Sequence, residues 1–256
     1  MRIMHPIASA LGATVFLGLP VIAERAADSA AFNTLRSGAW QTYRGQAGAT
    51  GWRCHVIRPD PDDHGPDGIN LHDWDEDGNL DAFVNAEEGQ YSRLYFNPGP
   101  KDVREPWPDQ VEFRHGKCED SGMGDLDNDG DLDYIANGGW VYFNPGAEKV
   151  RDVASWTKMT LFDNERRVPT VADIDGDGLN DLVVGAREWY RQPKNGKHTA
   201  ANWSKHTIAK TRWPMNCIMH DVDADGDLDM VVPDRGVEVC WLVNPGGDRV
   251  ARPWQR

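Results

Sequence analysis

One nine-residue stretch organises the whole sequence: Asp73-Trp74-Asp75-Glu76-Asp77-Gly78-Asn79-Leu80-Asp81. It has aspartate at positions 1, 3, 5 and 9 and glycine at position 6, and the same pattern begins again at Asp125, Asp173 and Asp221. The four copies start 52, 48 and 48 residues apart. A self-similar unit of about 20–50 residues is the signature of a repeat architecture. The sequence therefore predicts an array of four similar units.

Each acidic stretch is followed by the same series of apolar segments and turns. In the first copy, Ala82-Phe83-Val84 follows directly, and Leu94-Tyr95-Phe96 then leads into Asn97-Pro98-Gly99. A tryptophan-led segment follows, as at Trp107. Short apolar runs without alternation predict strands covered on both faces, and Asn-Pro-Gly predicts a turn. We therefore expect an all-β fold, a β-propeller with four complete blade-like repeats, each blade packed between its neighbours.

The two ends of the array leave two arrangements open. A segment typical of an outer strand, residues 52–57, precedes the first acidic stretch, while Arg252-Pro253-Trp254 stands where another outer strand should begin. Either the N-terminal strand completes the fourth blade, or the chain is a fragment of a longer propeller, which we favour. A disulfide between Cys54 and Cys240 would support the first arrangement, because it requires neighbouring strands.

The N-terminus predicts an export signal at residues 1–23. Arg2 precedes an apolar run from Ile7 to Ala23, which is shorter than the roughly 20 residues that a membrane-spanning helix needs. An uncleaved membrane anchor is the alternative. We expect a lead-in segment at 24–51 and a repeat domain at 52–256, with acidic loops at 73–81, 125–133, 173–181 and 221–229. The expected location is secreted, periplasmic or at the cell surface, with no membrane span after cleavage.

Composition excludes several classes of protein. The 256 residues include 41 acidic and 27 basic side chains, a net charge of −14, which does not suit a nucleic-acid partner. The 26 glycines and 16 prolines favour short strands and turns over long helices. The four cysteines of an exported chain can form up to two disulfides in three possible connectivities, or remain buried thiols.

The acidic stretches have the ligand pattern of a calcium loop. Carboxylates at positions 1, 3 and 5 converge, the glycine allows a sharp turn, position 7 can offer a backbone carbonyl, and position 9 completes the set. Oxygen ligands in this number favour Ca²⁺ over Mg²⁺. Position 12, where a helix-flanked calcium loop needs glutamate, is apolar in every copy, so we expect the loops in β-hairpins. The predicted ligands of about four calcium ions are Asp73, Asp75, Asp77, Asn79, Asp81, Asp125, Asp127, Asp129, Asp131, Asp133, Asp173, Asp175, Asp177, Leu179, Asp181, Asp221, Asp223, Asp225, Asp227 and Asp229.

The third copy resembles a known family. Its residues 171–186, Val-Ala-Asp-Ile-Asp-Gly-Asp-Gly-Leu-Asn-Asp-Leu-Val-Val-Gly-Ala, are similar to the FG-GAP or VCBS repeats of integrin α-chain propellers and of secreted bacterial proteins. The resemblance covers residues 52–246 and implies calcium-loaded propeller blades, with ligand binding or adhesion as the usual role. The family pattern continues with proline, where this chain has Arg187, and the other copies lack Gly-Ala. Family propellers commonly have seven blades, which supports the fragment interpretation.

The sequence contains no standard catalytic signature, neither G-x-S-x-G nor H-E-x-x-H nor a phosphate-binding loop. His72 and His220 directly precede acidic loops, where each either faces a ligand or bonds to its loop. Arg187, Glu188, Trp189 and Tyr190 either form a sugar-binding patch or place their aromatic rings in the core. We expect a non-catalytic module that binds an extracellular glycan or protein. The alternatives are a calcium-dependent, lyase-like polysaccharide-active enzyme and a structural spacer of a larger surface protein.

Overall fold

The computed structural model describes residues 55–58, 65–162, 168–209, 217–234 and 238–255. The chain divides into two units, Met1–Tyr43 and Arg44–Arg256, and every described residue belongs to the second unit. The predicted export signal at 1–23 and the lead-in segment at 24–51 lie outside the described residues. Within these, no helix has the length and apolar character that crossing a membrane requires.

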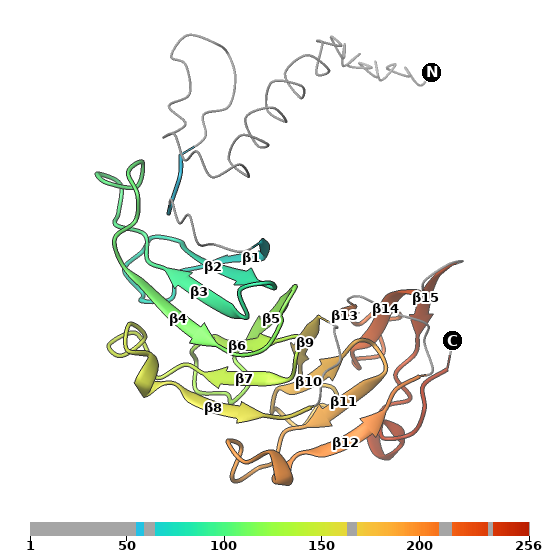
Figure 1. The fold of residues 1–256 in the computed structure, drawn as a ribbon. Helices are drawn as coiled ribbons and strands as arrows, with labels where there is room; N and C mark the ends of the chain where they lie inside the picture. The colour runs from blue at the N-terminus through green and yellow to red at the C-terminus, as the bar shows by residue number, and fades with distance from the viewer. Residues whose placement is uncertain (1–54, 59–64, 163–167, 210–216, 235–237, 256) are drawn as a thin grey trace, which may run out of the picture. The chain divides into compact units, whose positions relative to one another are not determined.

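The described residues form four antiparallel sheets, one for each repeat, in which strands that follow one another in sequence are neighbours (Figure 1). The first sheet contains β1 (Pro66–His72), β2 (Asp81–Ala86), β3 (Tyr91–Tyr95) and β4 (Gln110–Arg114). The second contains β5 (Ser121–Gly124), β6 (Asp133–Ala136), β7 (Trp140–Phe143) and β8 (Thr157–Thr160). The third contains β9 (Pro169–Ala172), β10 (Asp181–Val184), β11 (Glu188–Arg191) and β12 (Ser204–Thr207). The fourth contains β13 (Ile218–His220), β14 (Asp229–Asp234) and β15 (Glu238–Leu242).

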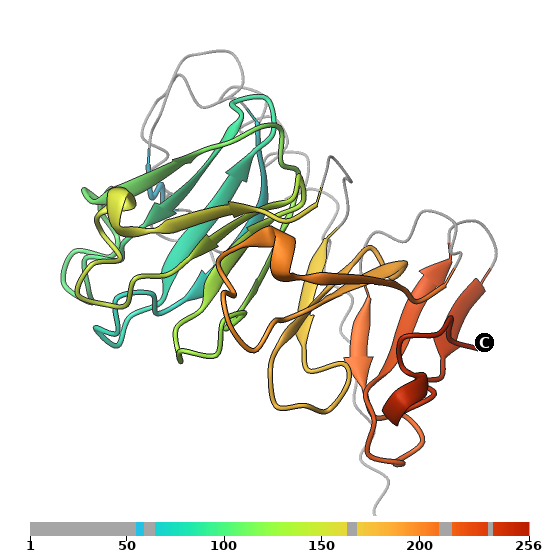
Figure 2. The ribbon, with the colours of Figure 1, turned by 90° about the horizontal axis from the view of Figure 1, so that it is seen from below.

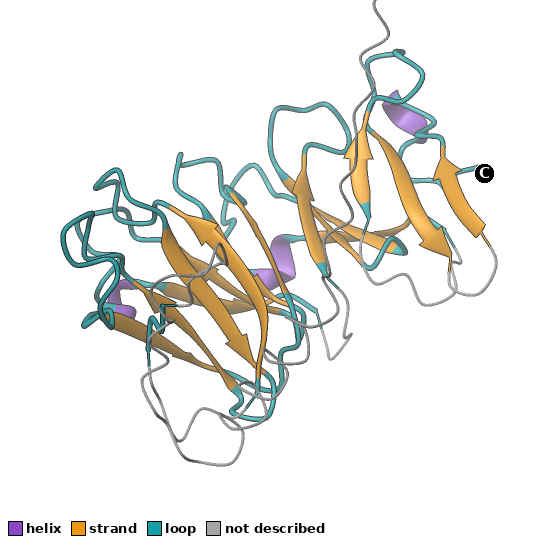
Figure 3. Cartoon of the chain, turned by 90° about the horizontal axis from the view of Figure 1, so that it is seen from above, coloured by secondary structure: helices purple, strands orange, loops and turns teal. Residues whose placement is uncertain are grey.

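Helical structure within the described residues is confined to three short 3₁₀ turns, η1 (Val153–Ser155), η2 (Ala200–Asn202) and η3 (Gly247–Arg249), drawn in purple in Figure 3. The predicted all-β fold is therefore confirmed for this part of the chain. Figure 2, seen from below, shows the successive hairpins of each sheet.

Every acidic stretch connects the first and second strands of its sheet. The residue before position 1 pairs with the aspartate at position 9, as in His72 with Asp81 and Gly124 with Asp133. The third and fourth copies repeat this register. The loops thus lie in β-hairpins, as the apolar residue at position 12 predicted.

Apolar clusters lie between consecutive sheets. One cluster combines Phe83 and Leu94 of the first sheet with Tyr134 and Tyr142 of the second. Two further clusters join the second sheet to the third and the third to the fourth. All residues of the middle strands β6 and β10 are buried, because a sheet packs against each of their faces. This explains why these strands are apolar without alternation, and each fully buried large side chain contributes about 1.5–3 kcal/mol.

The second and third sheets approach each other closely at Gly122 on β5. A Cβ atom at this position would lie 2.2 Å from the carbonyl oxygen of Pro169, the first residue of β9. Any other residue would therefore push the two sheets apart. This close approach brings the third repeat within reach of the second acidic loop.

The described residues at the two ends of the array do not form the arrangement in which an N-terminal strand completes the fourth blade. Residues 55–58 contain no strand, and the Ile57 carbonyl accepts a hydrogen bond from Trp107 N at 2.7 Å, which attaches it to the first repeat. The outer position of the fourth sheet is taken instead by Gln255, which forms an isolated bridge with Val243. The structure therefore does not use the described part of the N-terminal segment to complete the fourth sheet.

The described cysteines are buried. Cys118 and Cys217 are thiols whose sulfur atoms contact the Asp120 carbonyl at 2.9 Å and the Thr170 hydroxyl at 3.7 Å. Burial raises the pKa of Cys118 to about 11, so this thiol is unreactive at neutral pH. Cys54, whose disulfide with Cys240 would have supported a four-bladed closure, lies outside the described residues.

Candidate metal centres

The aspartate at position 1 shapes each acidic loop. In the first loop, its two oxygens accept hydrogen bonds from the backbone N–H groups of Asp77 at 3.0 Å and Gly78 at 2.9 Å. The other three loops repeat both bonds. The glycine at position 6 has a φ between 85° and 102° in all four copies, a conformation that side chains with a Cβ rarely adopt. These contacts turn the chain back sharply, as the sequence pattern predicted.

The aspartate at position 9 is fully buried in all four loops. In the first loop, Asp81 accepts hydrogen bonds from Trp74 N at 3.0 Å and from Asn97 N at 2.7 Å. The Asn97 side chain also bonds to the Leu80 carbonyl and to Gly99 N, both at 3.0 Å. The Asn-Pro-Gly segment, which the sequence identified only as a turn, therefore fastens the acidic loop to the following hairpin.

Three carboxylates converge in every loop, although not the same three. In the first three loops, oxygens at positions 1, 3 and 9 lie within 4.8 Å of one another; in the fourth, positions 1, 3 and 5 do so. These groups are Asp73, Asp75 and Asp81; Asp125, Asp127 and Asp133; Asp173, Asp175 and Asp181; and Asp221, Asp223 and Asp225. The other predicted ligands stay predictions: position 5 of the first three loops, position 9 of the fourth, and the backbone carbonyls at position 7.

Two buried carboxylate oxygens in these groups have no hydrogen-bond partner. They are Oδ1 of Asp127 and Oδ1 of Asp175, at position 3 of the second and third loops. Asp127 is only 4% exposed. A buried polar atom without a partner costs about 1–3 kcal/mol, and a hard cation held by oxygen ligands would remove that cost. The residues present therefore fit a metal ion at these two loops.

Burial also disfavours the charged form of the position 9 carboxylates. Desolvation, with a smaller contribution from neighbouring aspartates, raises the pKa of Asp81 to about 6 and the pKa values of Asp133 and Asp181 to about 8. Without a nearby positive charge, burial and the repulsion within each loop together oppose full ionisation.

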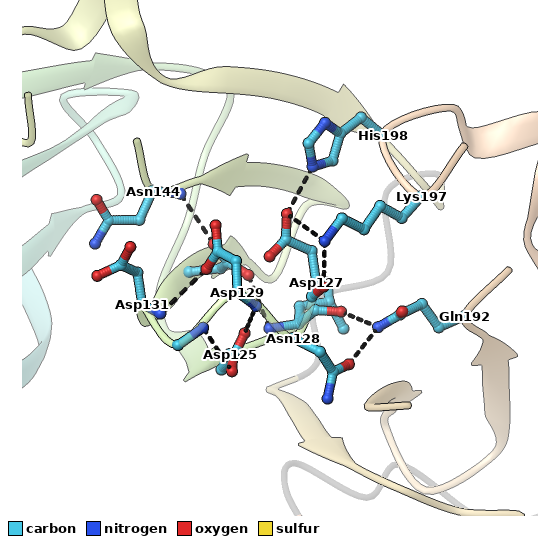
Figure 4. Close-up of polar contacts among 12 residues, drawn as sticks. Asp125, Asp127, Asn128, Asp129, Asp131, Asn144, Gln192, Lys197 and His198 are labelled. Carbon is cyan, nitrogen blue, oxygen red and sulfur yellow. Dashed lines mark hydrogen bonds and ion pairs between the residues drawn. The ribbon is translucent and has the colours of Figure 1, made fainter. Parts of the chain in front are cut away.

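Basic side chains contact the aspartate at position 3 in the first three loops. Arg151 contacts Asp75 Oδ2, and its guanidinium lies 4.0 Å from the Phe96 ring centroid. At the second loop, Lys197 Nζ and His198 Nε2 lie 3.3 and 2.7 Å from Asp127 Oδ2 (Figure 4). At the third loop, Arg191 Nε lies 2.6 Å from Asp175 Oδ2. We refer to Arg151, Lys197, His198 and Arg191 as the basic partners.

The fourth loop is more open. Asp223 and Asp225 are exposed, and no basic partner of Asp223 occurs among the described residues. Instead, Trp241 Nε1 donates a hydrogen bond to Oδ2 of Asp229, at position 9, at 3.0 Å. The loop with the most accessible carboxylates therefore adjoins a tryptophan that is 40% exposed.

A cavity of about 550 Å³ lies between the first two loops, lined by Glu76, Asp129, Asp131 and Lys149 among others. A smaller one of about 270 Å³ reaches His72 and Asp73. His72 packs edge-on against the Trp74 ring with centroids 5.9 Å apart. The two cavities share Glu76, Gly130 and Asp131, and four of the nine residues that line the larger one carry carboxylates.

Of the two interpretations of the segment on β11, the favoured one, in which the aromatic rings lie in the core, is confirmed. Trp189 and Tyr190 are 1% and 6% exposed. His220, by contrast, is exposed at the end of β13.

Sequence reasoning missed the basic partners. Arg151 is 76 residues from Asp75, and His198 is 71 residues from Asp127, so only the packing of consecutive sheets brings them together. The one available signal was a basic residue a few positions after the recurring turn, as in Asn144-Pro145-Gly146 followed by Arg151.

Comparison with known proteins identifies a known repeat in part of the chain. No curated protein matches the chain. Among solved structures, the chain is similar to the V. cholerae biofilm matrix protein Bap1, with 16% identity and a TM-score of 0.45 over 64% of this chain and 23% of Bap1. It is also similar to a bifunctional GH43-CE protein of Bacteroides eggerthii, with 13% identity and a TM-score of 0.37 over 70% of this chain and 24% of that protein. The matched region thus spans about a quarter of each of these two proteins. The sequence model of the FG-GAP-like repeat matches residues 73–136 and 125–184, which include the first three acidic loops, so this part of the chain consists of FG-GAP-like repeats.

Proposed function

We propose that this chain is an extracellular, calcium-binding β-propeller module that binds a glycan or protein ligand without catalysing a reaction. The observation that carries the proposal is the convergence of three carboxylates in each acidic loop, with an unpartnered buried oxygen on Asp127 and on Asp175. Such an arrangement of oxygen atoms is what a hard divalent cation requires.

Calcium is the ion that these loops suit best. All the converging atoms are carboxylate oxygens, and each loop carries four aspartates at positions 1, 3, 5 and 9. Mg²⁺ prefers stricter octahedral geometry and retains more water. When bound, the ions neutralise carboxylates that otherwise repel one another. The proposed ligands are the residues at positions 1, 3, 5, 7 and 9 of each loop.

The proposed propeller architecture is supported by the sheets. Three of the four are four-stranded antiparallel meanders, and apolar clusters connect each sheet to the next in the chain. Blades of a propeller have this strand order and bury both faces of their middle strands.

A binding role is favoured by the cavity between the first two loops. Its lining includes Asp129 and Asp131 of the second loop, so an ion bound there and Lys149 would both be available to the carboxylate or hydroxyl oxygens of a ligand. The clustered Ser92, His115 and Tyr134, by contrast, are poorly placed for catalysis. Their polar atoms lie 2.7–3.2 Å apart, but Ser92 and Tyr134 are fully buried and cannot meet a polymer.

Calorimetric titration of the chelator-treated chain with Ca²⁺ and with Mg²⁺ tests the ion. We expect calcium to bind in millimolar-range or tighter sites, with about four ions per chain. Terbium luminescence gives site information, because Trp74 is position 2 of the first loop and Trp241 contacts the fourth. Absence of calcium binding would refute the proposal.

Incubation with acidic and neutral polysaccharides, in calcium and in chelator, tests the role. Calcium-dependent retention without new product ends is expected. Calcium-dependent product formation would instead establish the lyase-like alternative.

A further inference from the structure

The third-position aspartates of the first two loops are held by the repeat that follows. Arg151, which contacts Asp75, comes after β7 of the second sheet, and Lys197 and His198, which contact Asp127, come after β11 of the third. We propose that ion binding at the second loop is coupled to the docking of the third repeat through Asp127, with Lys197 and His198 as positioning residues. This inference rests on the proposed calcium binding.

The two oxygens of Asp127 have different surroundings. Oδ2 contacts Lys197 and His198 of the third repeat, whereas Oδ1 is buried and has no partner. Asp127 also belongs to the carboxylate group with Asp125 and Asp133. Lys197 Nζ also donates to the Asp127 carbonyl. One residue therefore connects the candidate ion site to the next repeat through both its side chain and its backbone.

The segment that carries these basic partners is itself firmly attached. The His198 and Phe143 rings lie 4.3 Å apart between centroids, and Trp203 Nε1 donates to the Lys197 carbonyl at 2.7 Å. Trp203 is buried in the cluster between the second and third sheets. A shift of Lys197 therefore disturbs the packing of the third repeat as well as the position of Asp127.

Other bonds join the second loop to the third repeat. Asn180 Nδ2 donates to the Asp125 carbonyl at 2.6 Å, and Gln192 Nε2 donates to the Leu126 carbonyl and to Asn128 Oδ1 (Figure 4). Positions 1 to 4 of the second loop thus all have a contact with the following repeat. An ion that fixes these positions also fixes the surface on which that repeat docks.

The charges of the loop allow an ion and the basic partners to be present together. Four ionised aspartates at positions 1, 3, 5 and 9 exceed the charge of one divalent ion, so negative charge remains for Lys197. The Asp127 carboxylate contacts Lys197 and also belongs to the carboxylate group of the ion site, so its negative charge offsets the repulsion between the lysine and an ion. The basic partners are therefore expected to position Asp127 rather than replace the ion.

The third loop provides an internal control. Its basic partner Arg191 lies in the same repeat as Asp175, at the position taken by Phe96 and Phe143 in the first two repeats. In the fourth repeat, Ala251 occupies the place of Arg151, seven residues after the turn asparagine. Coupling through the third-position aspartate is therefore expected at the second loop but not at the third.

Hydrogen exchange measured with and without calcium tests the coupling. In the unmodified chain, calcium should slow exchange both in the second loop, residues 125–133, and in the docking segment, residues 192–203, by about 5–150-fold. In the double variant Lys197→Met/His198→Phe, slowing should persist in the second loop and at Gln192, which keeps its bonds to Leu126 and Asn128, and disappear from residues 197–203 of the docking segment. The single variant Lys197→Arg should keep the slowing in the docking segment, because arginine keeps the positive charge at this position. In Arg191→Met, the response of the docking segment should be unchanged.

The outcomes separate this inference from the proposed function. If calorimetry shows no calcium binding to the unmodified chain, both fail. If calcium binds but leaves the docking segment unaffected, or protects it equally in the double variant, only the coupling is overturned. Should the double variant not fold, Lys197→Gln alone leaves His198 in contact with Asp127 and must reduce the calcium response of the docking segment.

Discussion

The second and fourth acidic loops have the same aspartates at the same spacing but different surroundings. In the second loop, Asp127 is 4% exposed, with one oxygen bound by Lys197 and His198 and the other unpartnered. In the fourth, Asp223 is exposed, and Asp229 is bound by the indole of Trp241. The motif therefore specifies the loop conformation, while the neighbouring repeat determines burial and charge.

The same contrast extends to the apolar faces of the sheets. Trp189 and Trp241 hold equivalent positions, three residues before Gln192 in the third repeat and Asn244 in the fourth. Trp189 is 1% exposed because the fourth sheet covers it, whereas Trp241 is 40% exposed. A repeat that has a following repeat thus gains both a covered face and, in the first two loops, a basic partner. We expect the ion sites to differ for this reason.

Calcium removal should have the largest effect on stability. At a tenfold excess over its dissociation constant, one site stabilises the fold by about 1.4 kcal/mol, so four sites give about 5–6 kcal/mol. Chemical denaturation in calcium and in chelator measures the difference. Because the fourth loop is exposed, stability as a function of calcium concentration should show two classes of site. A single class of four equal sites would contradict the distinction between the second and fourth loops.

Neutralising the third-position aspartate should separate the two loops directly. Asp127→Asn removes a buried negative charge that contacts Lys197 and belongs to the carboxylate group of the ion site, and we expect a loss of about 2 kcal/mol in calcium. Asp223→Asn, at an exposed site without a described basic partner, should have a smaller effect. The free energies of unfolding of both variants, in calcium and in chelator, provide the measurement. Equal losses in calcium would show that the neighbouring repeat does not matter.

The fifth-position aspartate of the third loop tests the ion assignment. Asp177→Ala should lower stability by about 1.4 kcal/mol in tenfold calcium excess, because one ion site is lost. In chelator the loss should be smaller, because only the contacts of Asp177 with Arg191 Nη2 at 2.9 Å and with Leu179 N at 3.1 Å disappear, while Arg191 keeps its contact with Asp175. Melting temperatures under both conditions measure this. Equal destabilisation with and without calcium would mean that Asp177 stabilises the fold without an ion.

Much of the fold could be predicted because it depends on local pattern. The aspartate and glycine spacing predicted the four loops, and the apolar runs around Phe83 and Ile135 predicted the middle strands. Their burial on both faces followed from the lack of alternation. The indole of Trp107 donates to the Val103 carbonyl, and Trp254 repeats this bond with Val250. The sequence predicted a further outer strand near Trp254, and the structure has a single bridge there, at Gln255.

The rest could not be predicted because it depends on contacts between repeats. Nothing near Asp127 in the sequence indicates His198, which is 71 residues away. Similarly, the spacing does not indicate that position 9 converges in the first three loops and position 5 in the fourth. The backbone bond from Asn144 N to Asp133 Oδ1 is repeated from Asn244 N to Asp229 Oδ1, whereas the bond from Trp241 Nε1 to Asp229 Oδ2 belongs to the fourth loop. The sequence could name the candidate ligands but not which of them are buried together.

The smallest predicted effect comes from position 4 of the loops, where the backbone is left-handed in every copy. The third loop has Gly176 there with φ 70°, whereas the fourth has Ala224 with φ 61°. Ala224→Gly should therefore stabilise the fourth loop by up to about 1 kcal/mol, and Gly176→Ala should destabilise the third by a similar amount. No atom lies within 4 Å of a Cβ built on Gly176, so backbone strain alone would act.

Thermal denaturation in chelator measures both variants free of any ion. Because neither substitution changes a carboxylate or a contact with the following repeat, opposite shifts of similar size would show that the two loops share one backbone geometry. Their differences in ion binding would then arise from their neighbours. Shifts of the same sign would instead place part of the difference in the loops themselves.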